Sequence, residues 1–350
     1  WRVGVAGREV RWRRGLQMND ARDVAFATEA RLLGEGESLT FGAAGRSTET
    51  NVPWVTVQTP AGMFFGGLLW SGGWAIEASG EASATSLVAR WDGGEAAVPA
   101  DGVLEGVHGF FGAVAGGEAE ISAAMRTFVI DGLRGGREFP ALVSYNTWFV
   151  HGAHIDEAIA RREIAEAAKV GGELFQLDAG WYEGAGSHGA YDFTSGLGSW
   201  KVDETRFPHG LRAVGEDARA HGMRFGLWVE PERADLATVG RGDGPREEWL
   251  ATTDGLYRPG LANDEAGYAQ VCLAHPDAWN WALAHMVRLV DQEGVQYFVV
   301  DSNDWVNCTR EGHGHGATDG AFAHVQALYR LLAALRERFP ELLVENCAGG

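Results

Sequence analysis

The stretch that decides the fold is G-V-Q-Y-F-V-V-D-S-N-D-W, residues 294–305. The four residues before Asp301 are aromatic or β-branched, which is typical of one buried parallel strand. A carboxylate at the mouth of an apolar strand is costly unless it is paired or used. Because catalytic groups of parallel β-barrels lie at the C-terminal ends of the strands, Asp301 is a candidate catalytic residue. The alternative is that Asp301 caps the following loop, with Asn303 and Asp304 as turn formers.

Other predicted strands also lead into acidic residues. Strands are expected at 141–148, 174–177, 224–229 and 342–344, and the acidic residues that follow them are Asp178, Glu230, Glu232 and Glu345. Helical spacing of apolar residues predicts helices at 155–170, 211–221, 279–292 and 320–338. This β/α series predicts a (β/α)₈ TIM barrel. Since only about five strands are visible, we expect the barrel to be cut off after about strand 5.

The first part of the chain has a different pattern. Short apolar runs alternate with Gly-rich turns, as in V-P-W-V-T-V-Q-T at 52–59, and M-R-T-F-V-I at 125–130 is included among these runs. No strong helix pattern interrupts them, so the pattern predicts an antiparallel β-sandwich. The composition shifts around 133–140. We therefore expect an N-terminal β-sandwich domain at 1–138 and a partial catalytic barrel at 139–350.

Composition limits the partners. The 350 residues carry 48 acidic and 29 basic side chains, a formal charge of -19, which argues against nucleic acid and anionic membrane as partners. A neutral oligosaccharide or glycoside fits this charge better, and homo-oligomer formation is left open. No run of residues is long and apolar enough for a transmembrane helix, and the start W-R-V-G-V lacks the charged and apolar regions expected of a signal peptide. The chain starts with Trp1 rather than Met, so we expect the true N-terminus to be missing; location is left open, with the cytoplasm slightly favoured.

Cysteine and histidine usage gives little sign of metal or redox chemistry. The three cysteines are odd in number and widely spaced, so a disulfide framework is not expected. His313 and His315 lie in the Gly-rich stretch 311–317, and a solvated loop is the favoured interpretation because H-G-H alone fixes no ligand geometry. Cys347 is expected to be a small pocket-wall group rather than a nucleophile. We expect no metal and no cofactor.

The acidic strand ends are accompanied by tryptophans, which lie close to them in sequence: Trp148, Trp181, Trp200, Trp228 and Trp305. Carboxylates accept hydrogen bonds from hydroxyl groups, and aromatic faces stack on the C–H face of a pyranose. This combination favours a sugar substrate. Glycoside hydrolysis needs two carboxyl groups, about 5 to 5.5 Å apart in a retaining enzyme. Acidic rims also hold metals, so this signal is only moderately specific.

With these residues identified, the chain resembles glycoside hydrolase family 36, the melibiase-type retaining α-galactosidases. The matching motifs run in family order: N-T-W at 146–148, L-D-A-G-W at 177–181, L-G-S-W-K-V-D with R-F-P-H-G-L at 197–211, G-M-R-F-G-L-W-V-E-P-E at 222–232, D-S-N at 301–303 and E-N-C-A-G-G at 345–350. The resemblance is weaker over the sandwich, where G-L-L-W-S-G-G-W looks like the family's N-terminal domain. It implies a fragment truncated at both ends.

The resemblance also implies roles for single residues. Asp301 matches the nucleophile, and the acid/base is an aspartate after the following strand, outside this chain. Asp178 matches an aspartate that contacts sugar hydroxyls. The expected substrate-binding set is Asp178, Trp148, Trp181, Trp200, Trp228, Glu230, Asn303 and Cys347. The implied activity is retaining hydrolysis of terminal α-galactosides by double displacement, with no cofactor.

Some positions depart from the family pattern. The family has polar or aromatic sugar-contacting groups at Ala179, Val299 and Val300, and an arginine near Tyr268. A site without these groups holds galactose differently. The alternatives are therefore an α-N-acetylgalactosaminidase or another α-glycosidase, and a non-hydrolytic sugar-binding or transglycosylating relative. A metal-dependent barrel enzyme that uses the two histidines of loop 311–317 is the least favoured alternative.

Overall fold

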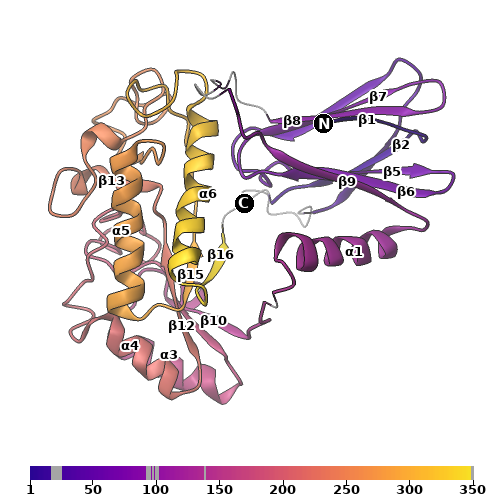
Figure 1. Ribbon diagram of the computed structural model, residues 1–350. Coiled ribbons are helices and arrows are strands. Elements are labelled where there is room, and N and C mark those ends of the chain that lie inside the picture. Colours follow the sequence, from indigo (N-terminus) through magenta and orange to yellow (C-terminus); the bar gives the residue numbers. More distant parts are fainter. Residues whose placement is uncertain (17–25, 92–95, 97, 99–101, 138, 348–350) are drawn as a thin grey trace. The chain divides into compact units, whose positions relative to one another are not determined.

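The computed structural model describes residues 1–16, 26–91, 96, 98, 102–137 and 139–347. The chain forms two compact units, Trp1–Pro140 and Ala141–Ala348, whose elements are labelled in Figure 1. The expected domain limit at Glu138 and the last three residues of the E-N-C-A-G-G motif lie outside the described residues. None of the helices in these ranges is both long and apolar enough to cross a membrane.

The first unit contains two antiparallel sheets. One has the strand order β1-β8-β7-β4 and the other β3-β2-β5-β6-β9. The strands are β1 (Arg2–Val5), β2 (Glu9–Arg14), β3 (Thr28–Leu32), β4 (Ser38–Ala43), β5 (Asn51–Thr59), β6 (Gly62–Leu69), β7 (Trp74–Gly80), β8 (Thr85–Trp91) and β9 (His108–Val114). The rings of Trp12 on β2 and Phe41 on β4 stack at 5.4 Å, which joins the two sheets. The β-rich character expected from the alternating runs is confirmed.

The expectation that no helix interrupts this region is wrong at its end. Helix α1 (Glu118–Thr127) and the π-helix η1 (Phe128–Leu133) occupy the segment that includes 125–130, which was expected to be a strand. The physical reason is the spacing of the apolar residues upstream. Ile121, Ala124 and Met125 lie on one helix face and pack with Met63 and Phe65 of β6. The aromatic and β-branched run at 128–130, taken alone, resembles a strand and hides this helical spacing.

The second unit is built on a parallel sheet with the strand order β10-β11-β12-β15-β16, the same as the chain order. Its strands are β10 (Ser144–Asn146), β11 (Leu174–Leu177), β12 (Arg224–Val229), β15 (Tyr297–Val300) and β16 (Leu343–Asn346). Helices follow the strands: α2 (Trp148–His151), α3 (Glu157–Lys169), α4 (Gly210–Ala220), α5 (Pro276–Glu293) and α6 (Gly320–Arg338). Figure 1 shows α5 and α6 side by side. The described residues thus form a partial parallel α/β region; a (β/α)₈ barrel cut off after about strand 5 stays a prediction.

The segment between β12 and α5 adds smaller elements. Strands β13 (Arg233–Asp235) and β14 (Tyr268–Gln270) form an antiparallel pair, and the 3₁₀ turns η2 (Leu236–Thr238) and η3 (Glu247–Trp249) lie between them. The strand expected at 141–148 is shorter than predicted, since Trp148 begins α2. The last strand extends past its predicted end, so Glu345 lies inside β16 rather than after it.

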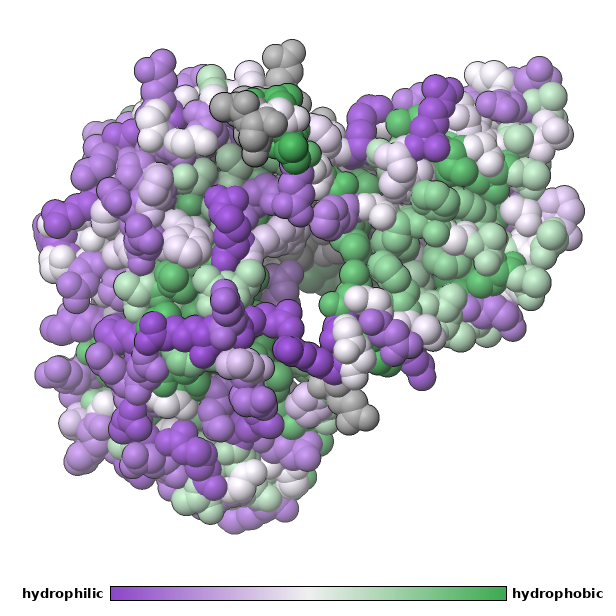
Figure 2. Space-filling view, in the orientation of Figure 1, coloured by the Kyte–Doolittle hydropathy of each residue, from purple (hydrophilic) through white to green (hydrophobic). Residues whose placement is uncertain are grey.

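The three central strands of the parallel sheet, β11, β12 and β15, are buried on both faces, which explains their mostly apolar sequences. Phe175, Phe225 and Phe298, on three neighbouring strands, are each 0% exposed. Helices α3 and α5 turn apolar residues such as Ile164 and Trp281 toward this core. By contrast, Figure 2 shows a mostly hydrophilic visible surface on the α/β unit, which accords with the charge of the chain.

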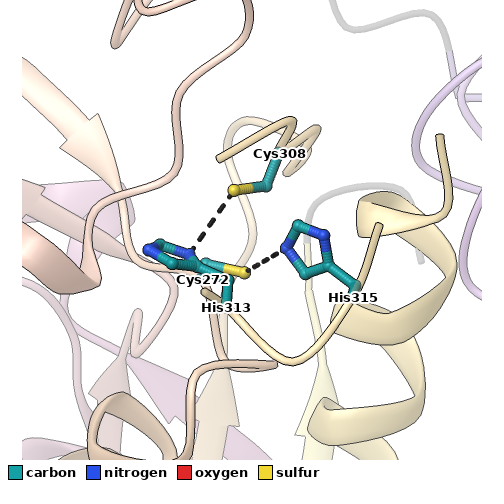
Figure 3. A group of neighbouring side chains, drawn as sticks. All are labelled: Cys272, Cys308, His313 and His315. Atoms are coloured by element: carbon teal, nitrogen blue, oxygen red, sulfur yellow. Dashed lines mark hydrogen bonds between the residues drawn. The ribbon is translucent and has the colours of Figure 1, made fainter. Parts of the chain in front are cut away.

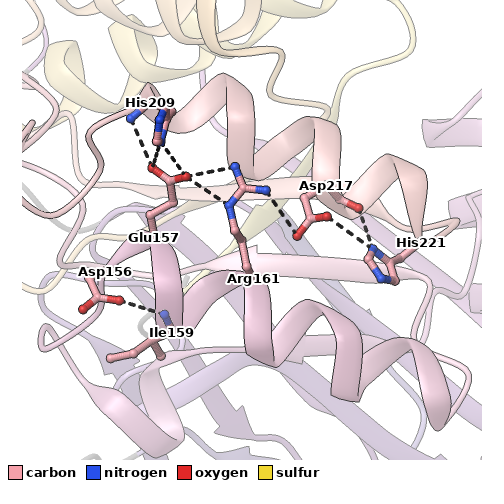
Figure 4. Close-up of polar contacts among 7 residues, drawn as sticks. All are labelled: Asp156, Glu157, Ile159, Arg161, His209, Asp217 and His221. Atoms are coloured by element: carbon pink, nitrogen blue, oxygen red, sulfur yellow. Dashed lines mark hydrogen bonds and ion pairs between the residues drawn. The ribbon is translucent and has the colours of Figure 1, made fainter.

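Polar contacts tie the beginning of α3 to α4 (Figure 4). The Asp156 carboxylate caps α3 by accepting a 2.7 Å hydrogen bond from the backbone of Ile159. Glu157 accepts from Arg161 at 2.9 Å and from the backbone N–H of His209, at the start of α4, at 3.1 Å. Burial raises the pKa of Glu157, but these donors outweigh it and leave the pKa below its ordinary value. The crossover between β11 and β12 is thereby held in place.

Candidate active site

The acidic residues predicted at the strand ends meet at one edge of the parallel sheet. Asp178 follows β11, Glu230 follows β12 and Asp301 follows β15, and these strands are direct neighbours. Their exposed fractions are 8%, 1% and 7%. The negative charge of Asp301 contributes to a raised pKa at both other carboxyls, although burial is the larger cause. The three carboxyl groups therefore lie near enough to one another for the charge of Asp301 to influence the pKa of the other two.

Asp301 is held by three hydrogen-bond donors. Its Oδ2 accepts from the indole Nε1 of Trp228 at 3.1 Å and from the side-chain amide of Asn303. Its Oδ1 accepts from the backbone N–H of Ser302 at 2.9 Å. The backbone N–H of Asp301 still bonds to Val229 of β12 at 2.8 Å, so the sheet fixes the position of the carboxylate. Three donors suit an ionised carboxylate, which only accepts hydrogen bonds.

Glu230 hydrogen-bonds to the loop that follows β15. Its Oε1 accepts from the backbone N–H of Asn303 at 2.7 Å, and its Oε2 accepts from Arg233 Nη2 at 2.7 Å. Burial raises the pKa of Glu230 to about 7, against the opposing effect of Arg233. Since both oxygens are engaged and the side chain is almost fully buried, Glu230 lies where it positions Asn303, and through it Asp301. The sequence predicted a substrate contact for this residue.

Asp178 is the second carboxyl that could face a substrate. Its Oδ2 accepts from the side-chain amide of Asn146 at 2.7 Å and its Oδ1 from the backbone N–H of Ala179 at 2.8 Å. The backbone N–H of Asp178 donates to Thr147 Oγ1 at 3.0 Å. These contacts join the N-T-W and L-D-A-G-W motifs. Burial raises the pKa of Asp178 to about 6, and the charges of Asp301 and Glu345 add to the rise.

Glu345 and Glu232 are engaged elsewhere. Glu345 accepts from Gln176 and from the hydroxyl of Tyr297, each at 2.8 Å, inside the sheet. The Oε1 of Glu232 lies 2.6 Å from Nε2 of His324 on α6. The Nδ1 of that histidine accepts from the backbone N–H of Leu273, so Nε2 carries the proton that is donated to Glu232. The sequence gave no sign of this contact, because His324 lies within an otherwise ordinary amphipathic helix.

The predicted tryptophans fall into two groups. Trp181 is 0% exposed, donates its Nε1–H to the carbonyl of Trp228 at 3.0 Å and stacks on Trp200 at 5.9 Å. Trp200 is also buried and has a positive φ of 48°, a conformation rare for a bulky residue. Trp228 is 2% exposed and is the member of this group that contacts Asp301. All three rings are buried, so they do not offer an open stacking surface.

Trp148 and Trp305 are more accessible. Trp148 is half-buried and meets the rings of Tyr191 and Phe193 edge-on at 5.7 and 5.5 Å. Trp305 is 42% exposed. Cys347 is half-buried, and its backbone N–H donates to the carbonyl of Val300 at 2.9 Å, which places it beside the end of β15. Within the predicted substrate-binding set, Trp148, Asn303 and Cys347 are thus only half-buried, and Trp305, outside that set, is exposed.

The expectation of a solvated loop for the two histidines is wrong for His313. This side chain is 2% exposed and contacts Cys308, while His315 contacts Cys272. The four residues form a group able to hold a metal ion. The sequence does not reveal this group because Cys272 lies far from the other three residues in the chain; the signal that is present in the sequence is the close spacing of Cys308, His313 and His315.

The comparisons with known proteins agree with this fold. Residues 118–350 match the family model described as Melibiase. The chain therefore belongs to the Melibiase family.

Two curated relatives are alpha-galactosidases. The chain is 33% identical to "Alpha-galactosidase" of Escherichia coli over 218 residues, which is 59% of this chain and 27% of the relative. It is 28% identical to "Alpha-galactosidase 2" of Pediococcus pentosaceus over 211 residues, again 59% of this chain and 27% of the relative. Only about a quarter of each relative's length is thus matched.

Solved structures match over the whole chain. An alpha-galactosidase from Lactobacillus brevis superimposes with a TM-score of 0.79 at 19% identity, covering 100% of this chain and 47% of that one. A variant of the glycoside hydrolase family 36 alpha-galactosidase AgaA from Geobacillus stearothermophilus, in complex with stachyose, gives a TM-score of 0.75 at 17% identity, with 100% and 48% coverage. At this identity the similarity shows the fold, a β-rich unit followed by an α/β unit. The chain spans about half the length of these structures.

Proposed function

We propose that this chain carries the nucleophile half of a retaining glycosidase that cleaves terminal α-galactosides. The observation that carries the proposal is the Asp301 carboxylate, fixed at the C-terminal end of β15 by Trp228, Ser302 and Asn303. Membership of the Melibiase family and the names of the curated relatives supply the substrate class.

The first step forms a bond between Asp301 and the sugar. Among the described residues, Oδ2 accepts two hydrogen bonds and Oδ1 accepts one, so Oδ1 keeps the freer lone pair for attack on the anomeric carbon. As that bond forms, the bond from the anomeric carbon to the leaving oxygen breaks and an acid protonates the leaving oxygen. In the second step water attacks the same carbon, the former acid takes up the proton, and Asp301 is released.

The acid/base is assigned by the family resemblance to an aspartate beyond residue 350. Glu230 is unsuited to that role because Asn303 and Arg233 occupy its two oxygens and its side chain is 1% exposed. Asp178 is assigned to the sugar hydroxyls. Its raised pKa allows it to exchange a proton near neutral pH, but its oxygens are oriented by Asn146 and the backbone of Ala179, which suits binding.

Three positions where the family resemblance predicts sugar-contacting groups carry apolar side chains. Ala179, Val299 and Val300 are 1%, 2% and 4% exposed and offer no side-chain donor. Near the same loop, Tyr268 is covered by the guanidinium groups of Arg233 and Arg258, at 4.9 and 4.2 Å from the ring centroid. Fewer polar contacts should weaken discrimination among sugars that differ at one hydroxyl.

The test is hydrolysis of aryl α-galactoside, α-N-acetylgalactosaminide and α-glucoside by the full-length protein. We expect the galactoside to be cleaved and Asp301→Ala to lower kcat by roughly 10³-fold or more, as for loss of a nucleophile. Asp264→Ala, at an exposed position, is the matched control and should keep full activity. Wild-type activity in Asp301→Ala would overturn the assignment. Cleavage of another sugar would keep the nucleophile and change the substrate.

A further inference from the structure

A second group of reactive side chains lies outside the carboxylate site. Cys272 follows β14, whereas Cys308, His313 and His315 belong to the loop between β15 and α6. One ligand atom from each of the four residues lies within 4.8 Å of all the others. Figure 3 shows the two thiols and two imidazoles turned toward one another. Two sulfurs and two nitrogens that converge in this way are the donor set of a Cys₂His₂ zinc site.

Both imidazoles are oriented with a free nitrogen toward the group. His313 Nε2 lies 2.8 Å from the carbonyl oxygen of Glu248, and His315 Nδ1 lies 2.6 Å from that of Gly316. A carbonyl oxygen only accepts hydrogen bonds, so each of these nitrogens carries the proton. The unprotonated nitrogens, His313 Nδ1 and His315 Nε2, then face the cysteines. Metal-binding histidines are typically fixed by such a bond to their second nitrogen.

The distances fit a tetrahedral ion. Cys308 Sγ lies 3.5 Å from His313 Nδ1, and Cys272 Sγ lies 3.5 Å from His315 Nε2. With Zn–S of about 2.3 Å and Zn–N of about 2.0 Å, the edge between a sulfur and a nitrogen of a tetrahedron is about 3.5 Å. Two sulfur–nitrogen edges thus already have the length that a shared zinc ion would give them.

The surroundings favour a closed, structural site. Cys272 and Cys308 are both 0% exposed and pack with Ala251 and Val306, and His313 is 2% exposed. Four protein ligands leave no position for water or substrate, which distinguishes a structural zinc site from a catalytic one. Thiolate ligands select Zn²⁺ over Mg²⁺, Ca²⁺ or Mn²⁺.

We propose that Cys272, Cys308, His313 and His315 bind one structural Zn²⁺ ion. The ion would join the segment after β14 to the loop that begins at Asp301, and so close a loop in the chain between Cys272 and Cys308. Other contacts already connect these regions, since the backbone N–H of Thr309 bonds to Thr252 at 2.7 Å. The role of the ion is to hold the loop that carries Asn303 and Trp305 at the rim of the sheet.

The first test is the metal content of the full-length protein, purified without a metal-affinity tag and measured by inductively coupled plasma mass spectrometry. We expect about one zinc per chain. Cys308→Ser and His313→Gln should each lower the content at least about tenfold, in line with the loss of one of four ligands. Cys347→Ser, a third cysteine outside the group, and His188→Gln, an exposed histidine, are matched controls and should keep the metal.

A ligand variant that does not fold would also lose the metal. A second test therefore uses the wild-type protein. After removal of metal by a chelator, titration with Co²⁺ should give the intense visible absorption of a tetrahedral thiolate complex at one equivalent, and Zn²⁺ should displace it. The thermal unfolding temperature should fall on chelation and return with Zn²⁺. Neither readout depends on sugar hydrolysis, so failure here is distinguishable from failure of the proposed activity.

Two results would overturn the proposal. One is a wild-type protein that holds less than about 0.1 zinc per chain and neither binds Co²⁺ through thiolate nor gains stability from Zn²⁺. The other is a disulfide between Cys272 and Cys308 in a peptide map of the native protein, since an oxidised pair cannot supply the two thiolates.

Discussion

The buried carboxyl of Asp178 should make the stability of the α/β unit depend on pH. The variant Asp178→Asn measures how much of that pH dependence comes from this residue. Burial, reinforced by the charges of Asp301 and Glu345, raises its pKa from 3.8 to about 6 despite the bonds from Ala179 and Asn146. A raised acid pKa means that the folded state prefers the protonated form. The stabilisation is therefore complete below about pH 4 and is lost as the pH rises through about 6.

The magnitude follows from the shift. A difference of about 2 pKa units corresponds to about 3 kcal/mol between the two protonation limits. Between pH 4 and pH 7.5, Asp178 should thus cost the wild-type protein about 2 kcal/mol of unfolding free energy. The variant cannot ionise at this position, so it does not pay this pH-dependent cost. Its lost hydrogen bond with Asn146 adds an offset of about 1 kcal/mol that is the same at each pH.

The assay is urea unfolding of wild type and Asp178→Asn, followed by tryptophan fluorescence at several pH values from 4 to 7.5. The difference in unfolding free energy, variant minus wild type, should rise by about 2 kcal/mol across this range. Asp264→Asn, at an exposed position, serves as the control and should show a flat difference. A flat difference for Asp178→Asn, or one that falls with pH, would refute the reasoning.

Three further predictions concern the support of the site and the sheet. Trp228→Phe removes the indole donor to Asp301 and should lower kcat/KM about tenfold, as expected for a bond to a charged group. Because the ring is 2% exposed, the smaller side chain should also cost about 1 to 3 kcal/mol of stability; unchanged kinetics would count against the role of the indole. Arg233→Met leaves Glu230 buried without its partner and should cost about 3 kcal/mol at pH 8 and less at pH 5, where the carboxyl protonates; equal losses at both pH values in urea unfolding would contradict this. Phe298→Ala opens a cavity at a side chain that is 0% exposed and should cost about 3 to 5 kcal/mol; a loss below about 1 kcal/mol would show that the core collapses around it.

The parallel sheet could be predicted closely from the sequence. The strands at 174–177 and 224–229 and the helix at 320–338 have the same bounds in the structure, and all three predictions are confirmed. Strands buried on both faces carry uninterrupted apolar runs that stop abruptly at polar residues, so their ends are visible in the sequence. For the same reason the carboxylates after β11, β12 and β15 could be assigned to one edge.

Features that depend on contacts between distant segments could not be predicted. The helix at Glu118–Thr127 is stabilised by Met63 and Phe65, which lie far from it in the chain. Glu345 remains inside β16 because Tyr297 of the neighbouring strand donates to it. A short window of sequence around the helix does not contain Met63 or Phe65, and one around Glu345 does not contain Tyr297. The local pattern therefore predicts a strand at 125–130, where the structure has helix, and ends the last strand before Glu345.

The same limit applies to the site. Sequence patterns predict that Asp301 and Asp178 follow strands of one sheet, as the structure shows, but they do not reveal which polar groups support others. Glu230 was grouped with the former, although its partners Arg233 and Asn303 occupy both of its oxygens. The group around His313 depends on Cys272, whose position is set by the path of the chain after β14 rather than by local spacing.

The central claim is that Asp301 is the nucleophile. Its most direct test is to inactivate the full-length protein with a fluorinated α-galactosyl fluoride that accumulates the covalent intermediate, then to digest it and locate the sugar by tandem mass spectrometry. We predict the label on the Asp301 side chain, and no label in Asp301→Ala. A label on another carboxylate, such as Asp178, or steady hydrolysis of a galactoside with no labelled species, would contradict the account.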